Sequence, residues 1–223
     1  ELIPMRFDSL IFDIDGTLWD STYAVAASFS EASAEFPYGK KTFTREKIMG
    51  EQGLPLKTIF ADLYPEIEEL IKKDPKAAEE MMDTINTVST RYEYDYLREH
   101  GGRVFDGVKE TLELLSSKLP LFIVSNCEKG YIEIMTETSG IQQYFKDWLC
   151  YGDTNAEKDV TIGRIVEKHG LKAPVYIGDI RNDALSSKKA GVPFIWAAYG
   201  FGNVTEDLYC EKIDDFRELK ELI

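Results

Sequence analysis

The sequence predicts an α/β fold, a doubly wound parallel sheet with a helical cap inserted after its first strand. Short apolar runs such as residues 9–14 and 174–177 are too short for helices and end in turn residues, as buried strands do. From Gly101 onward such runs alternate with amphipathic segments, and this alternation favours a parallel sheet with helices on both faces. Residues 20–95 instead show apolar side chains at helical spacing, which predicts a separate group of helices.

Beyond Gly101, helices are expected where apolar residues recur every three or four positions, and strands where they are contiguous. The expected helices lie near residues 107–117, 131–135, 162–169, 183–190 and 215–222. The expected strands lie near residues 119–124, 148–150, 174–177 and 193–196. Together with the strand at residues 9–14, they predict a core domain of residues 1–19 and 96–223, and residues 20–95 form the predicted cap domain.

The chain carries a formal net charge of −14. The negative electrostatic field of such a chain repels polyanions, and no dense cluster of Lys and Arg offsets it. Nucleic acid is therefore not an expected partner. No apolar run approaches the roughly 20 residues of a membrane helix, and no secretory signal is visible. The three cysteines form no CxxC pair, which fits a reducing compartment. We therefore expect a cytoplasmic protein with no membrane partner; monomer and homodimer both stay open.

Polar residues follow several of the predicted strands. Asp13 and Asp15 end the first strand, Ser125 and Asn126 follow another, and Asp179 follows a third. In such sheets ligands bind at the carboxyl ends of the strands, so these side chains are expected to converge. Neighbouring carboxylates suppress one another's ionisation unless a cation neutralises them. Hard oxygen ligands favour a divalent cation, and Mg²⁺ is the usual ion where phosphate also coordinates.

Four segments together resemble the motifs of the haloacid dehalogenase-like (HAD) hydrolase superfamily. They are Phe12–Leu18 (Phe-Asp-Ile-Asp-Gly-Thr-Leu), Val124–Asn126, Lys158 and Gly178–Asp183. The resemblance extends from residue 8 to about residue 202, and it implies a HAD-like Rossmannoid core. The helical insertion resembles the C1 cap of the phosphoglycolate phosphatase and β-phosphoglucomutase-like group.

The resemblance implies a role for each matching residue. Asp13 would attack phosphorus to form an aspartyl-phosphate, since an ionised carboxylate needs no activating base. Asp15 would protonate the leaving oxygen and then activate water. The implied phosphate-binding residues are Thr17, Ser125, Asn126 and Lys158, which also has a catalytic role. The implied Mg²⁺ ligands are Asp13, the backbone carbonyl of Asp15, Asp179 and Asp183, the last acting directly or through water or Lys158.

Three further residues are candidates for contact with the substrate. Trp19 follows the nucleophile loop and lies at the mouth of the site or, alternatively, in the core. Gly50 and Glu51 belong to residues 50–53, which resemble the glycine-containing loop that enters the site in the C1-capped group. A plain turn between helices is the alternative for this segment.

The predicted function is a Mg²⁺-dependent phosphatase that hydrolyses a small phosphomonoester. A phosphomutase of the β-phosphoglucomutase type is an alternative, and it would return the phosphoryl group to the sugar. A signalling receiver domain is a single module of roughly 100–150 residues without the helical insertion, and the sequence argues against it. Intact acidic motifs also argue against a non-catalytic protein that binds a phosphorylated ligand. The substrate stays open among phosphoglycolate, sugar phosphates and nucleoside monophosphates.

Overall fold

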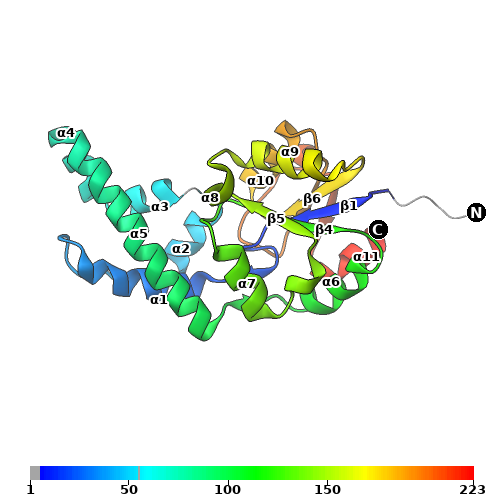
Figure 1. Ribbon diagram of the computed structural model, residues 1–223, viewed down its shortest axis with the longest axis horizontal. Helices are drawn as coiled ribbons and strands as arrows, with labels where there is room; N and C mark the ends of the chain where they lie inside the picture. The colour runs from blue at the N-terminus through cyan, green and yellow to red at the C-terminus, as the bar shows by residue number, and fades with distance from the viewer. Residues whose placement is uncertain (1–5, 55) are drawn as a thin grey trace, which may run out of the picture. The chain divides into compact units, whose positions relative to one another are not determined.

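The computed structural model describes residues 6–54 and 56–223, and the chain divides into two compact units (Figure 1). The first contains the residues up to Asp20 together with Arg103–Ile223, and the second contains Ser21–Gly102. We call them the sheet unit and the helical unit. In the described part of the chain, no helix combines the length and apolar character that crossing a bilayer requires.

Six parallel strands form the sheet of the first unit, in the order β5-β4-β1-β6-β7-β8. Their bounds are β1 Ser9–Phe12, β4 Leu121–Ser125, β5 Asp147–Cys150, β6 Pro174–Gly178, β7 Phe194–Ala197 and β8 Glu211–Ile213. The predicted doubly wound parallel sheet is confirmed. β8 was not predicted, because two of its three residues are charged, as is common at a sheet edge.

The central strand β1 pairs with β4 on one side and with β6 on the other. Leu10 lies between Leu121 and Val175 in this register, and all residues of β1, β4 and β6 are buried. The chain leaves β1 toward β4 but leaves β6 in the opposite direction, toward β7. The edge between β1 and β6 is therefore a topological switch point, where ligands bind in open α/β sheets.

Helices cover both faces of this sheet (Figure 1). On one face Ile162 and Ala184 pack into a cluster with Phe122 and Tyr176. On the other face the Phe12 ring contacts Phe216 at a centroid distance of 5.8 Å. The helices of the first face are α9 (Lys158–His169) and α10 (Arg181–Lys189), and those of the second are α6 (Val108–Ser116), α7 (Tyr131–Ser139) and α11 (Leu219–Leu222).

Two short elements of the sheet unit stand outside the main sheet. β2 (Trp19–Asp20) pairs antiparallel with β3 (Arg103–Val104), so Asp20 and Arg103 are register partners. α8 (Tyr151–Thr154) follows β5 directly. The β2–β3 pair marks the point where the chain leaves the sheet unit and returns to it.

The helical unit contains five α-helices within its described residues. They are α1 (Thr22–Ala32), α2 (Arg45–Glu51), α3 (Leu56–Leu63), α4 (Glu66–Lys73) and α5 (Pro75–His100). Aromatic and branched side chains form its core, with Phe29 against Phe60 at a centroid distance of 5.3 Å. The predicted domain boundary at residue 96 falls inside α5. The helix continues because no glycine or proline interrupts it before Gly101, whose φ of 67° ends it.

Candidate active site

Asp13 lies directly after β1, at the switch point of the sheet. Its backbone N–H donates to the Ile177 carbonyl of β6 at 2.9 Å, so the ladder fixes the backbone on which this carboxylate stands. Asp13 as a whole is only 2% exposed. A nucleophile at this place has a rigid base and little surrounding water.

Two further buried carboxylates share the site with Asp13. Asp179 follows β6 and Asp183 lies in the first turn of α10, and both are fully buried. One carboxylate oxygen from each of the three residues lies within 4.8 Å of the others. The structure therefore brings together three of the predicted site residues, from separate parts of the chain.

Lys158 joins this group from the start of α9. Its Nζ lies 2.6 Å from Asp183 Oδ1 and 3.2 Å from Asp13 Oδ1, and its side chain is almost wholly buried. Burial acts to lower the pKa of Lys158, but the two carboxylates outweigh it and hold the pKa above its usual value. The ammonium group is therefore charged at neutral pH.

The carboxylates respond to burial in the opposite sense. Burial, and next the Asp183 charge, raises the pKa of Asp13 to about 7 against the opposing effect of Lys158. Burial, with Asp183 and Asp13, also raises the pKa of Asp179 well above its ordinary value. When all are ionised, three negative charges and one positive charge leave two negative charges uncompensated among these four residues. A hard divalent cation with oxygen ligands fits this set in charge and in donor type.

Backbone and hydroxyl donors hold Asp179 in place. The Phe201 N–H donates to its Oδ2 at 2.8 Å, and the Thr17 hydroxyl lies 3.4 Å from its Oδ1. Trp196 of β7 donates its indole N–H to the Asp179 carbonyl at 3.1 Å. Sequence reasoning missed both residues: the backbone N–H of Phe201 leaves no signature in the sequence, and the indole of Trp196 reaches Asp179 from the neighbouring strand. Thr17 was predicted to bind phosphate; here it is fully buried and oriented toward Asp179.

Gly16 is required for the close approach of the first loop to Asp179. Its φ is +80°, and a Cβ atom built there would lie 2.0 Å from Asp179 Oδ2. Gly200 meets the same carboxylate from the loop after β7, where a Cβ would lie 2.4 Å from the Gly16 carbonyl oxygen. Only glycine fits such contacts, so the three segments pack backbone to backbone around this carboxylate.

The phosphate-binding candidates of β4 lie at the same edge of the sheet. The pairing of Phe12 with Ile123 places Ser125, the last residue of β4, and Asn126 beyond the end of β1 on the neighbouring strand. Ser125 is buried, and the thiol of the adjacent Cys127 has its pKa raised well above the usual value, chiefly by burial. This thiol is therefore protonated, which gives no support to a cysteine nucleophile.

Asp15 stands apart from the three clustered carboxylates. Its Oδ1 accepts hydrogen bonds from the Tyr131 hydroxyl at 2.7 Å and from Trp19 Nε1 at 3.0 Å. Trp19 was a candidate for substrate contact, but it is fully buried and its polar atom faces Asp15. Trp19 lies in the interior of the sheet unit, and its contact with substrate stays a prediction.

The two cap candidates lie at the end of α2 in the helical unit. Gly50 has no heavy atom within 4 Å of the place where a Cβ would stand, so this glycine is not required by packing there. Glu51 is buried, and its carboxylate lies 3.0 Å from Lys47 Nζ. Burial, and next the neighbouring Asp62, raises the pKa of Glu51. Their contact with substrate stays a prediction.

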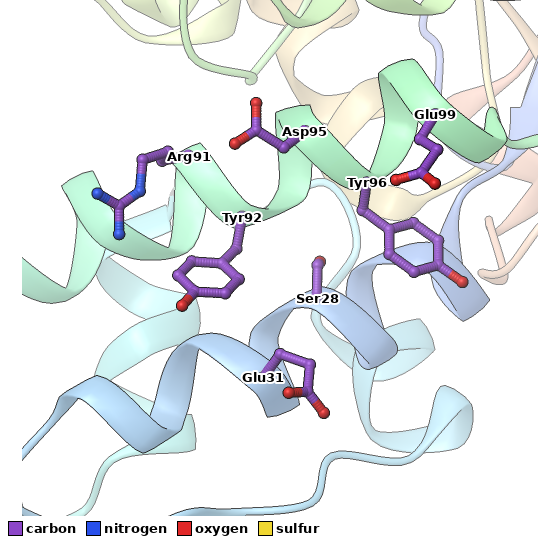
Figure 2. Close-up of a pocket in the computed structure, with 7 residues that line it drawn as sticks. All are labelled: Ser28, Glu31, Arg91, Tyr92, Asp95, Tyr96 and Glu99. Atoms are coloured by element: carbon purple, nitrogen blue, oxygen red, sulfur yellow. The ribbon is translucent and has the colours of Figure 1, made fainter.

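A groove of about 440 Å³ runs between α1 and α5 of the helical unit (Figure 2). It is lined by Ser28, Glu31, Arg91, Tyr92, Asp95, Tyr96 and Glu99. Arg91 donates to Glu35 at 3.2 Å, so its charge is already engaged. Three carboxylates against one engaged guanidinium make the groove a poor receptor for a phosphorylated ligand.

The model of the haloacid dehalogenase-like hydrolase family matches residues 10–197. The chain belongs to this family. The resemblance drawn from the four motifs is therefore confirmed, and the protein is a haloacid dehalogenase-like hydrolase.

Relatives of this hydrolase match it over most of their length. A 5'-nucleotidase of Pseudomonas aeruginosa is 26% identical, and the match covers 97% of each chain. A phosphoglycolate phosphatase of Shigella boydii is 29% identical, over 91% of this chain and 83% of that protein. Among solved structures, a haloacid dehalogenase-like family hydrolase from Streptococcus pneumoniae shares the fold with a TM-score of 0.79 at 21% identity, over 97% of this chain and 98% of that one.

Proposed function

We propose that this hydrolase is a Mg²⁺-dependent phosphatase that cleaves a small phosphomonoester through an aspartyl-phosphate at Asp13. The observation that carries the proposal is the buried Asp13 carboxylate, 3.2 Å from Lys158 and grouped with Asp179 and Asp183. An uncompensated group of this charge is costly in a protein interior, so its presence favours a site that receives a cation together with an anionic substrate.

In the proposed first step, an Asp13 carboxylate oxygen attacks phosphorus while the bond from phosphorus to the leaving oxygen breaks. Asp15 gives a proton to that oxygen, so the product leaves as an alcohol. Lys158, Ser125 and Asn126 bind the phosphate oxygens and stabilise the negative charge on them. Mg²⁺, held by Asp13, Asp179, Asp183 and the Asp15 carbonyl, would supply further positive charge to the phosphate oxygens.

In the second step, water attacks the phosphorus of the aspartyl-phosphate and gives its proton to Asp15. The bond between phosphorus and the Asp13 oxygen breaks, which releases inorganic phosphate and restores both carboxyl groups to their starting states. Burial of Asp13 limits uncontrolled access of water to the intermediate.

We propose the helical unit as the cap, with Gly50 and Glu51 contributing to substrate choice. The position of this unit in the chain, between β2 and β3, supports the assignment. The names of the two relatives suggest nucleoside monophosphates and phosphoglycolate as the first substrates to test.

The test is release of inorganic phosphate from p-nitrophenyl phosphate and from a panel of phosphoglycolate, phosphohexoses and nucleoside monophosphates. We expect activity with Mg²⁺, none after EDTA treatment, and a loss of at least about a thousandfold in Asp13→Asn. Activity that survives EDTA or the substitution would overturn the mechanism. A phosphohexose that yields an isomer rather than free phosphate would establish the mutase alternative.

A further inference from the structure

Two donors converge on a single oxygen of Asp15. The Tyr131 hydroxyl donates to Oδ1 at 2.7 Å, and Trp19 Nε1 donates to the same atom at 3.0 Å. The two rings contact each other edge-on, with centroids 5.9 Å apart and an interplanar angle of 75°. All three residues belong to the sheet unit, so this arrangement does not depend on the helical unit.

The elements that carry the two donors are firmly held. Trp19 belongs to β2, pairs with Val104 of β3, and accepts the Gly16 N–H at its carbonyl at 2.9 Å. Tyr131 is the first residue of α7 and is 4% exposed. Aromatic side chains have few rotatable bonds, and both rings are packed in the interior. The donors therefore form a rigid frame around the carboxylate.

This frame resists rotation of the Asp15 side chain. An indole N–H can only donate, and a buried donor that loses its acceptor destabilises the structure. If the carboxylate turned away, Trp19 and Tyr131 would both lose this acceptor in the interior. Oδ1 thus remains an acceptor, and the carboxyl group of Asp15 is held in one orientation.

We propose that Tyr131 and Trp19 are positioning residues that orient Asp15 for proton transfer to the leaving oxygen. The inference rests on the proposed function, in which Asp15 is the general acid. Proton transfer requires the acid within hydrogen-bond reach of the reacting atom, and small misplacements lower the rate strongly. The two residues lie outside the four family motifs and act only through Asp15.

The experiment compares two esters that differ in their need for an acid. Phenyl phosphate has a poor leaving group and needs protonation, whereas p-nitrophenyl phosphate needs it far less. In Tyr131→Phe, which retains the ring, we expect kcat/KM with Mg²⁺ to fall about tenfold for phenyl phosphate and at most about threefold for p-nitrophenyl phosphate. Trp19→Phe should show the same difference, and Tyr144→Phe, in the turn Gln142–Tyr144, is the control with neither loss.

An equal loss on both esters in Tyr131→Phe, or no loss on either, would overturn the inference. A spectroscopic arm is independent of turnover: the indole N–H resonance of Trp19, assigned with Trp19→Phe, should shift in Asp15→Ala and in Tyr131→Phe. A resonance that does not respond to Asp15→Ala would also overturn it. Wild-type protein that releases no phosphate from any ester of the panel would instead refute the proposed function, and with it the catalytic part of the inference.

Discussion

Lys158 in the sheet unit and Lys47 in the helical unit each bridge two carboxylates, but in very different surroundings. Lys158 lies between Asp13 and Asp183, and its side chain is 1% exposed. The side chain of Lys47 is 43% exposed. Water cannot screen the buried arrangement, so each charge there depends on the others.

Lys47 also contacts two carboxylates, but these contacts contribute differently to stability. Its ammonium group contacts Asp62, which is exposed, and Glu51, which is buried. Water reaches the lysine and Asp62 and screens their charges, so this pair contributes little to stability. A lysine between two acids therefore indicates a functional site when all three groups are buried, because burial makes their charges depend on one another. The residue types alone do not indicate such a site.

The largest expected effect is on removal of each lysine. Lys158→Met should lower the free energy of unfolding by about 3–5 kcal/mol in the metal-free protein, because it leaves carboxylates buried without their partner. It should also abolish phosphate release. Lys47→Met should have little effect on stability. Urea unfolding of both variants measures the difference in the free energy of unfolding. Equal destabilisation would show that burial does not distinguish the two lysines.

The next effect concerns the close packing around the buried acids. Gly16→Ala should destabilise the protein by about 2–3 kcal/mol and impair activity, since its Cβ would collide with Asp179. Gly191→Ala is the matched control in the same unit, with a φ of +73° and no atom within 4 Å of the added Cβ. In that variant the free energy of unfolding should fall by only about 1 kcal/mol, because the alanine strains the backbone at a positive φ but collides with nothing. Thermal unfolding should separate the two, and similar costs would show that the contact with Asp179 is unimportant.

A smaller effect follows from the raised pKa of Asp13, about 7 in the folded chain against about 3.9 when unfolded. Between these values the folded, metal-free protein holds a proton that the unfolded chain releases. Its free energy of unfolding should therefore fall as pH rises through this window, by at most about 1.4 kcal/mol per pH unit from this group. The raised pKa of Asp179 acts in the same direction.

Unfolding curves from about pH 4 to about pH 7 with EDTA test this linkage, with Asp13→Asn as the control that should show a shallower slope. Saturating Mg²⁺ should remove most of the loss, because bound cation favours the ionised carboxylates. A slope unchanged by Asp13→Asn would mean that this carboxyl does not titrate in the window.

The smallest effect is expected in the helical unit. Glu51→Gln should leave stability nearly unchanged and alter KM for the preferred substrate by about threefold to tenfold, with kcat less affected. Lys57→Gln, on the exposed side of α3, is the control. An unchanged KM across the substrate panel would remove Glu51 from the proposed cap contacts.

The parallel sheet and the convergence of acidic residues at the ends of its strands could be predicted because short segments of the sequence carry both signals. Asp13 and Asp179 each end a short apolar run, and parallel topology brings such ends together. Tyr131 and Phe201 could not be predicted, because they reach Asp15 and Asp179 from distant segments without a motif of their own. The charged edge strand β8 was missed for a related reason, since its pairing with β7 is set by tertiary contacts and not by apolar pattern.

The pairing of Asp20 with Arg103 has a consequence for how this fold changes over time. The helical unit, Ser21–Gly102, is inserted between β2 and β3, which pair as the two strands of a hairpin do. Because β2 and β3 form a separate two-stranded sheet, the strand order of the main sheet does not depend on the length or architecture of that insertion. Selection can therefore exchange the helical unit while the sheet unit keeps every strand in register.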